Sequence, residues 1–392
     1  MRILSITSSY PRYEGDRYGL FIHELNNEVA KTGNYIAALV PLAYGFKNIN
    51  PQKNLTIYRF QYFFPSKFQR LSYGYGMFVN VKMSMLAKLQ LPFFLMAELL
   101  GAMWLISKER IEIIHAHWII PQGLIAVILK ALFNVPVIVT VHGTDLRECP
   151  RIIRRYILNN ADAIVTPHPE LKEILSREGY DVKEVKNLIG DSHIDMEETL
   201  KLKKELDLNN MIVVTFIARL DEFKDPITFV RSVPHVLKQV QNVRFLLVGE
   251  GNLEGAVRDA IYMNGVEDVV KLMGKRDDIG NILSLSTIFV ALSPIENIWS
   301  LTILEAIKCR VPCIVTNSGT TAEHLQHRIH AFLIEPKSEI DLSNAIIELI
   351  CDTILREQLV ENSLNLLDRS GFSSTHIVNS TISLYDNCLR RQ

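Results

Sequence analysis

The sequence is poor in cysteine and carries almost no net charge. Its 392 residues include five cysteines, an odd number, and none belongs to a C-x-x-C pair. This spacing indicates neither a disulfide framework nor a zinc site, and it is typical of buried free thiols in a reducing cytoplasm. The 42 basic and 43 acidic residues give a formal charge of −1, which argues against a dedicated nucleic-acid-binding protein.

Long hydrophobic runs are also missing. The most apolar run, Leu91–Ile106, contains Pro92 and Glu98 and is shorter than the about 20 apolar residues that a membrane-spanning helix needs. The apolar stretch within Met1–Thr7 is too short for a signal peptide. No P-loop motif occurs. We therefore expect no transmembrane segment, no secretion signal and no Walker-type nucleotide site.

What the sequence does contain is material for two α/β domains. Apolar residues make up 48 % of the chain, and the length predicts two domains. Short β-branched runs alternate with helical periodicities, which indicates two successive doubly wound parallel sheets. The predicted strands are Arg2–Thr7, Tyr35–Val40, Ile111–His115, Val135–Val141, Ala163–Thr166 and Val182–Asn187, then Ile212–Ile217, Val243–Val248, Val269–Met273, Thr287–Ala291 and Pro312–Thr316.

Domain boundaries follow from this alternation. We assign 1–195 to a first Rossmann-like domain, 196–374 to a second, and 375–392 to a terminal helix. Ligands of open α/β sheets bind beyond the carboxyl ends of the strands, so we expect a site in a crevice between the domains. The residues that follow strands are therefore the candidates.

Two cations follow the first predicted strand of the second half. Arg219 and Lys224 lie on a short loop after Ile212–Ile217, and Pro226 suits the first turn of the next helix. Cations at a strand end beside a helix N-terminus form an anion site, most naturally for a diphosphate. A solvated loop with two incidental charges is the alternative.

Two carboxylates flank a later helix start. Glu305 lies three residues after Thr302, a spacing typical of a capping box. Glu296 precedes the helix and has no helix to cap. Together they could hold the hydroxyls of a polyol while the amides near Ser300 and Leu301 face a phosphate.

A glycine-rich turn follows the strand Val243–Val248. The spacing G-x-G-x-x-x-G from Gly249 to Gly255 differs by one residue from the dinucleotide fingerprint. The following strand leads to Lys275 rather than to an acidic residue. This pattern predicts a tight turn of the same sheet and not a nicotinamide site.

Histidines gather after two strands of the first half. Alternation places His115 and His117 on one face, a spacing that can bind a metal ion, although one packed and one hydrogen-bonded histidine is the favoured reading. His142 and Asp145 follow the next strand. After the first strand, the turn 8–20 carries Gly15 and Gly19, which can let a backbone approach a ligand closely.

Taken in order, these segments resemble glycosyltransferase family 4, the retaining enzymes that use nucleotide sugars. The resemblance extends along nearly the whole chain. It rests on IHAHW at 114–118, VHGTDL at 141–146, ARLDEFK at 218–224, LVGEG at 247–251 and LEA at 304–306, followed by Gly319 and Glu323. The chain departs from the family pattern in having eight residues between Glu296 and Glu305 instead of seven, in Arg310 where glycine is usual, and in Ser192–Asp195, which replaces the usual Asn-Gly-x-Asp.

The resemblance implies a GT-B fold whose terminal helix returns to the first domain. It implies that Arg219 and Lys224 hold the donor diphosphate, that Glu305 holds the ribose, and that Glu296 and His142 lie at the reacting centre. Donor contacts are also expected from Gly249, Lys275, Ser300 and Leu301, and acceptor-side contacts from Gly15, Gly19, His117 and Asp145. The implied reaction transfers a sugar with retention from a UDP- or GDP-sugar, without a metal ion, to a glycan or lipid-linked acceptor.

One segment points to a membrane. From Lys47 to Lys88 there are seven basic and no acidic residues, interleaved with aromatic side chains. This composition suits an anionic membrane surface or a lipid-phosphate acceptor. A membrane surface would place a cytoplasmic enzyme peripherally at the membrane. A half-buried strand and loop with a solvated rim is the alternative. Two other activities stay open: a nucleotide-sugar epimerase of the same fold, and a metal-dependent hydrolase using the histidines and Asp145.

Overall fold

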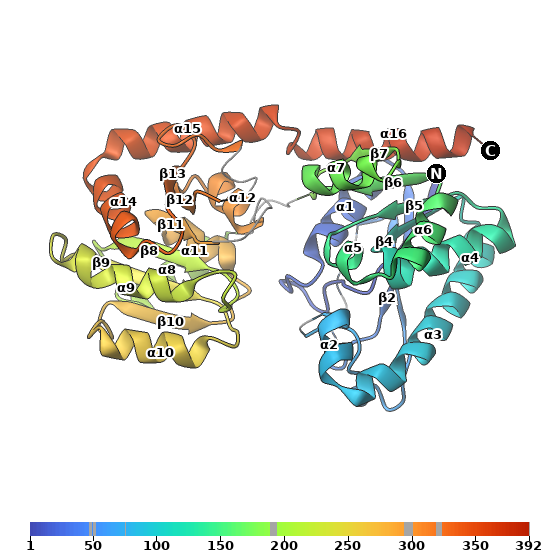
Figure 1. Ribbon diagram of the computed structural model, residues 1–392, viewed down its shortest axis with the longest axis horizontal. Coiled ribbons are helices and arrows are strands. Elements are labelled where there is room, and N and C mark those ends of the chain that lie inside the picture. The colour runs from blue at the N-terminus through green and yellow to red at the C-terminus, as the bar shows by residue number, and fades with distance from the viewer. Residues whose placement is uncertain are drawn as a thin grey trace. The chain divides into compact units, whose positions relative to one another are not determined.

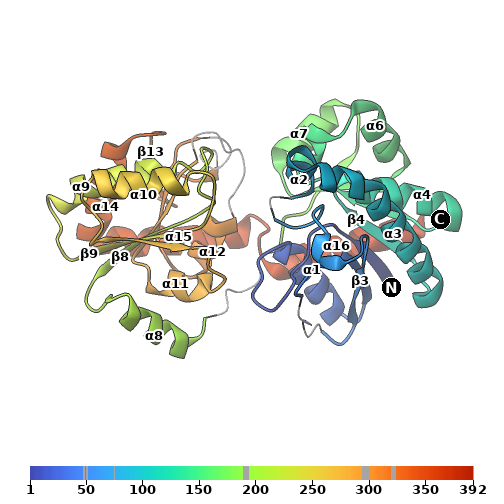
Figure 2. The same cartoon turned by 90° about the horizontal axis from the view of Figure 1, so that it is seen from below.

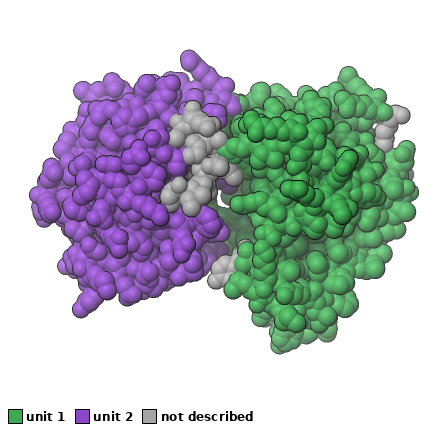
Figure 3. Space-filling model, viewed as in Figure 1, with its two compact units in different colours: residues 1–190, 371–392 green, residues 191–370 purple. Residues whose placement is uncertain are grey.

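The computed structural model describes residues 1–46, 49, 52–74, 76–188, 194–293, 301–318 and 324–391. The chain divides into two compact units, coloured separately in Figure 3. The first unit comprises Met1–Gly190 together with Gly371–Gln392, and the second comprises Asp191–Ser370. Each unit is built on its own parallel sheet (Figure 1), which confirms the predicted pair of doubly wound α/β domains.

The first unit contains a seven-stranded parallel sheet in the order β3-β2-β1-β4-β5-β6-β7. Its strands are β1 (Arg2–Ile6), β2 (Tyr35–Pro41), β3 (Leu55–Phe60), β4 (Ile113–His117), β5 (Val137–Thr140), β6 (Ala163–Thr166) and β7 (Val182–Glu184). Its helices are α1 (Leu20–Lys31), α2 (Met77–Met83), α3 (Met85–Glu109), α4 (Leu124–Phe133), α5 (Thr144–Glu148), α6 (Arg151–Asn160), α7 (Pro169–Arg177) and α16 (Ser374–Arg390).

Helices cover both faces of this sheet, which is why its central strands are apolar on both sides. On one face, Leu4 of β1 shares a core with Phe94 of α3 and Leu129 of α4. On the other face, Ile3 packs into a core with Ile22 of α1. Figure 1 shows α3 and α4 on one side of the strands and α16 on the other.

The late helix α16 belongs to the first unit. Its Ile377 and Val378 are buried in the same core as Ile22. The Tyr385 hydroxyl lies 2.8 Å from Nδ1 of His115 on β4. The first unit is therefore completed by a segment that follows the whole of the second.

The second unit contains a six-stranded parallel sheet in the order β10-β9-β8-β11-β12-β13. Figure 2 shows both units from a second direction. Its strands are β8 (Ile212–Ile217), β9 (Val243–Val248), β10 (Val270–Gly274), β11 (Ile288–Ala291), β12 (Cys313–Thr316) and β13 (Phe332–Ile334). Its helices are α8 (Met196–Glu205), α9 (Pro226–Leu237), α10 (Glu254–Met263), α11 (Ile279–Leu285), α12 (Leu301–Lys308), α14 (Glu339–Cys351) and α15 (Thr353–Arg369).

Several predicted strands differ from the observed ones. The strand predicted at Val182–Asn187 is shorter, since β7 ends at Glu184, and the strand predicted at Val135–Val141 is trimmed at both ends to β5. The strand expected at Ile111–His115 runs two residues later, as β4, so His115 and His117 lie within it rather than at its end. The edge strand β3 was not predicted, because its charged and half-buried sequence lacks a continuous apolar run. The strand β13 was also missed, because it has only 3 residues.

Helix α3 is longer than its apolar run suggests. It has 25 residues and is long and apolar enough to cross a membrane by length and composition alone, with 33 % of its most apolar window buried. The apolar run Leu91–Ile106 is by itself too short to span a membrane, but the complete helix α3 is not too short. Its inward face is that of a core helix, since Phe94, Glu98 and Leu105 are completely buried against the rest of the first unit.

Glu98 makes stability depend on pH. Burial raises the pKa of its carboxyl to about 8, although Nε2 of Gln122 donates to it at 3.1 Å. The folded state keeps a proton that the unfolded state releases near the ordinary glutamate pKa. This group's contribution to the free energy of unfolding is therefore present at acidic pH and lost as pH rises toward 8, by about 1.4 kcal/mol per pH unit within that window.

We expect Glu98→Gln to become progressively more stable, relative to the unmodified protein, as pH rises from 5.5 to 8.5. Urea denaturation at three pH values measures this. The exposed Glu173 of α7 offers a matched control, because Glu173→Gln should leave the pH dependence unchanged. A constant stability difference across the range would contradict the assignment.

Candidate active site

Three histidines lie together at the carboxyl ends of β4 and β5. His115 and His117 share one face of β4, as predicted, with ring centroids 4.4 Å apart. Nδ1 of His117 lies 3.3 Å from Nε2 of His142. The ring of His115 is fully engaged, by Tyr385 and by Oγ1 of Thr140 at 2.7 Å. Nε2 of His117 is buried and has no hydrogen-bond partner among the described residues.

Burial keeps these histidines neutral. It lowers the pKa of His115 to about 4, and it lowers the pKa of His142 to about 3 with further contributions from His168 and His115. At neutral pH His142 therefore carries no charge and can accept a hydrogen bond. Within the described part of the chain, no three histidine, cysteine, aspartate or glutamate side chains are placed to hold a metal ion.

Asp145 fixes the loop that carries His142. Its Oδ1 accepts hydrogen bonds from the backbone amides of His142 at 3.1 Å and Gly143 at 2.8 Å, and its Oδ2 accepts one from Ile119 at 2.8 Å. Gly143 has a φ of 105°, which glycine adopts without strain. Burial raises the pKa of Asp145 to about 6 against the opposing effect of these amides. The carboxylate thus acts through the backbone around His142.

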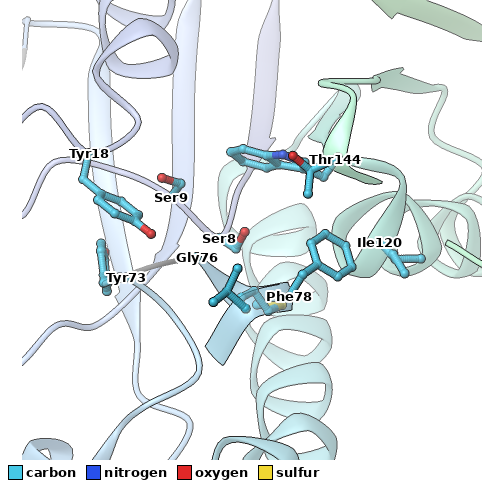
Figure 4. Close-up of a pocket in the computed structure, with 11 residues that line it drawn as sticks. Ser8, Ser9, Tyr18, Tyr73, Gly76, Phe78, Ile120 and Thr144 are labelled. Carbon is cyan, nitrogen blue, oxygen red and sulfur yellow. The ribbon is translucent and has the colours of Figure 1, made fainter. Parts of the chain in front are cut away.

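A pocket of about 200 Å³ opens at the same edge of this sheet. Figure 4 shows Tyr18 and Tyr73 on one side of it and Ile120 and Thr144 on the other. It is lined by Ser8, Ser9, Tyr18, Tyr73, Gly76, Met77, Phe78, Val79, Trp118, Ile120 and Thr144. Ser8, Ser9 and Tyr18 belong to the predicted turn 8–20, and Trp118 and Thr144 belong to the IHAHW and VHGTDL segments. Sequence reasoning did not predict that these residues line one pocket.

Backbone geometry shapes this pocket. Trp118 has a φ of 78°, an unusual value for a large side chain, and its ring lies 4.7 Å from that of His142. Gly19 has a φ of 66°, and a Cβ there would lie 2.3 Å from the carbonyl oxygen of Ser9. Gly19 therefore allows its own backbone to approach that of Ser9, a residue that lines the pocket. Gly15, the other glycine of the predicted turn, also has a positive φ, of 88°, which glycine adopts without strain.

In the second unit, the loop after β8 carries the predicted cations. Nη2 of Arg219 lies 3.1 Å from Oδ2 of Asp221, and 73 % of the Arg219 side chain is exposed. The backbone amide of Lys224 donates to the carbonyl of Asp221 at 3.1 Å. Asp225 caps α9, and Pro226 begins it as predicted. Both cations therefore lie on one short loop between β8 and α9.

The glycine turn after β9 packs directly on this loop. A Cβ at Gly249 would lie 1.8 Å from the carbonyl oxygen of Ala218, so only glycine fits there. The amide of Leu220 donates to the carbonyl of Glu250 at 3.0 Å. The amide of Gly249 donates to Gly274 at 2.8 Å, and the exposed Lys275 follows Gly274. The predicted tight turn is confirmed, and it brings the ends of β8, β9 and β10 together.

The ends of β11 and β12 join the same edge. The Ser293 hydroxyl donates to the carbonyl of Phe223 at 2.9 Å, and its amide donates to Oγ1 of Thr316 at 3.1 Å. Glu305 is buried within α12, which Leu301 begins. Glu296 and Ser300 lie outside the described residues. Arg219, Lys224 and Gly249 thus meet on adjoining loops, while the geometry around Glu296 and Ser300 is not described.

Comparison with known proteins gives consistent matches across both units. The family model described as Glycosyl transferases group 1 matches residues 198–365, and that described as Glycosyltransferase Family 4 matches residues 58–186. The chain is 26 % identical to the N-acetyl-alpha-D-glucosaminyl L-malate synthase of Bacillus anthracis, covering 72 % of this chain and 77 % of that protein. It is 28 % identical to the UDP-Gal:alpha-D-GlcNAc-diphosphoundecaprenol alpha-1,3-galactosyltransferase of Escherichia coli, covering 70 % and 77 %.

A solved structure shares the fold over the full length. Anabaena HepE in complex with UDP and glucose superimposes with a TM-score of 0.72 at 17 % identity, covering 99 % of this chain and 100 % of that one. At this identity the likeness concerns the fold alone. This shared fold agrees with the two Rossmann-like units described above, each of which has a parallel sheet.

Proposed function

We propose that this chain, which belongs to glycosyltransferase family 4 and has the GT-B fold, transfers a sugar with retention from a nucleoside diphosphate sugar to an acceptor hydroxyl. Glycosyltransferase activity follows from the family; the donor, the stereochemistry and the residue roles are our proposal. The observation that carries it is the gathering of Arg219, Lys224 and the Gly249 turn at one edge of the second sheet. This edge brings two cations next to a tight turn of the backbone, an arrangement that suits a diphosphate.

Charge separation explains why such an edge suits the reaction. As the glycosidic bond breaks, the sugar becomes cation-like and the leaving diphosphate gains negative charge. Fixed cations close to the phosphates stabilise that state. Arg219, Lys224 and Lys275 would do so without a metal ion, and Glu305 would hold the ribose. The assignments of Glu296 to the sugar and of Ser300 and Leu301 to the phosphates follow from the resemblance.

We assign the histidine group of the first unit to the acceptor. A neutral His142 can accept a hydrogen bond from a sugar or acceptor hydroxyl, because burial holds its pKa far below neutrality. The pocket beside it, with its aromatic lining, suits an acceptor that has an apolar or ring surface. We assign Gly15, Gly19, His117 and Asp145 to the construction of this acceptor side, with Asp145 acting through the loop of His142.

Two of the similar proteins support a UDP-sugar donor, and one of these supports a lipid-linked acceptor. The Escherichia coli relative is named for UDP-Gal and a diphosphoundecaprenol acceptor, and HepE was solved with UDP and glucose. A relative from Mycobacterium tuberculosis is named as GDP-mannose-dependent. We infer a UDP-sugar donor and a lipid-linked acceptor, and hence a cytoplasmic enzyme working at the membrane surface. The epimerase and hydrolase alternatives are not favoured by these relatives.

Thermal unfolding in the presence of UDP- and GDP-sugars tests this proposal. A ligand at one hundred times its Kd stabilises the folded state by about 2.7 kcal/mol, so the matching UDP-sugar should raise the Tm clearly while its free sugar does not. A response to GDP-sugars alone would replace uridine by guanosine. No response to any nucleotide sugar at millimolar concentration would contradict the proposal, and conversion of the donor without an acceptor would favour the epimerase.

A further inference from the structure

Helix α3 presents a continuous apolar face to solvent. Six of its large side chains each expose more than half of their surface: Met85, Leu89, Phe93, Met96, Leu100 and Trp104. Successive members are three or four residues apart, so they lie along one side of the helix. The row extends for about 28 Å at the α-helical rise. We call it the α3 stripe.

The stripe is not the core-facing side of the helix. Ala87, Phe94, Ala102 and Leu105, on the opposite side, are buried in the core of the first unit. The helix also packs beside α4 on the same face of the sheet, as Figure 1 shows. Since α3 already fills its place in the core, the stripe requires a partner from outside the unit.

A neighbouring loop enlarges this surface. The ring of Phe63 packs edge-on against Phe93, with centroids 6.2 Å apart. Gln90 of α3, which is buried, donates to the carbonyl of Phe68 at 2.7 Å and accepts from the amide of Arg70 at 2.8 Å. These contacts hold the loop that carries Phe64 against α3, and Phe64 itself is 84 % exposed.

The exposed charged residues of α3 are basic. They are Lys88 and Lys108. Of the two acidic residues of the helix, Glu98 is buried on the opposite side, and the partly buried Glu109 pairs with Arg2 and lies 3.7 Å from Nζ of Lys108. Nζ of Lys108 lies 4.2 Å from the ring centroid of Trp104. Lys67 and Arg70 are exposed on the adjoining loop. An apolar row flanked by lysine, arginine and tryptophan complements a lipid surface with anionic headgroups.

We propose that the α3 stripe, together with Phe64 and Phe68, docks the first unit on an anionic lipid bilayer, with the helix lying in the interface rather than crossing it. The proposal refines the expected role of 47–88. Of the aromatic residues in that segment, Phe60, Tyr62 and Tyr73 are buried, so they pack the unit internally. The apolar contact comes from α3, and the basic segment supplies its flanking cations. The inference rests on the membrane association proposed above but needs neither donor nor acceptor.

Sedimentation with phosphatidylcholine vesicles, with and without 30 % phosphatidylglycerol at low salt, tests the docking surface. We expect the unmodified protein to bind the anionic vesicles and the double variant Phe93→Glu/Leu100→Glu to lose at least tenfold in partitioning. Tyr262→Glu/Met263→Glu is the matched control, because both residues are exposed on α10 of the second unit. The double variant Lys88→Ala/Lys108→Ala should lose mainly the preference for phosphatidylglycerol.

Three results would overturn the proposal. The unmodified protein could fail to bind either vesicle, or the α3 variant could bind as well as the control. Alternatively, sedimentation velocity could show a dimer that the α3 variant abolishes, without vesicle binding, which would assign the stripe to a second copy of the chain. Nucleotide-sugar-dependent thermal stabilisation of the α3 variant separates these results from a failure of the proposed activity, since the second unit is unchanged.

Discussion

Replacing Lys224 by alanine is expected to lower turnover on a nucleotide sugar at least a hundredfold. Lys224 lies on the loop between β8 and α9, tied to Asp221 through its backbone amide. Removing one preorganised group that stabilises developing negative charge costs about 3–4 kcal/mol in the transition state. Release of the nucleoside diphosphate in a steady-state assay measures the effect.

The control for this prediction is Lys238→Ala. Lys238 is an exposed lysine at the end of α9 in the same unit, where the chain leads into the amino end of β9 rather than leaving the carboxyl end of a strand. The Lys238→Ala variant should keep its turnover unchanged. It measures the effect on turnover of losing one positive charge away from the proposed site. Near-normal activity of Lys224→Ala would remove Lys224 from the mechanism, and Arg219→Ala would then decide whether this loop binds the diphosphate.

Replacing Asp145 by alanine should destabilise the first unit by about 3 kcal/mol or more and abolish most activity. The change leaves the amides of Ile119, His142 and Gly143 without their acceptor. Each buried unsatisfied group costs about 1–3 kcal/mol. Loss of these bonds also frees the loop of His142. Urea denaturation and turnover together measure both effects.

Asparagine at this position gives a graded test. The oxygen of Asp145→Asn can still accept from His142 and Gly143, but its NH₂ group then faces the amide of Ile119, so an intermediate loss is expected. Arg147→Ala is the control, since Arg147 is exposed on the same short helix. Equal stability of Asp145→Ala and Arg147→Ala would show that the carboxylate does not hold the loop.

The fold was largely predictable because parallel sheets have a strong signature. Central strands such as β8 and β9 are rich in β-branched and other apolar residues and almost entirely buried, and their predicted bounds are those of the structure. The strands at the edges of the two sheets were not predictable in the same way. The strand β3 is half-buried and carries Arg59, and β13 is too short for a pattern to develop.

The site was predictable to the extent that strand order brings loops together. The approach of the Arg219 loop to the Gly249 turn follows from β8 and β9 being neighbours. Interactions that depend on side-chain direction could not be read from spacing. The three amides held by Asp145 and the positive φ of Trp118 are examples. The pairing of His115 with Tyr385 joins residues too distant in sequence for any local pattern to indicate.

The packing of α16, which carries Tyr385, against the first unit also affects the order in which the protein can fold during synthesis. A ribosome delivers the chain from the N-terminus, and domains generally fold as they emerge. The second unit is contiguous and can finish during synthesis, whereas the first must wait, with the face of its sheet around Ile3 and Ile22 uncovered, until Ile377 and Tyr385 arrive. The part of the molecule synthesised first is therefore the last to become complete, and it is the part that would depend on chaperones in the interval.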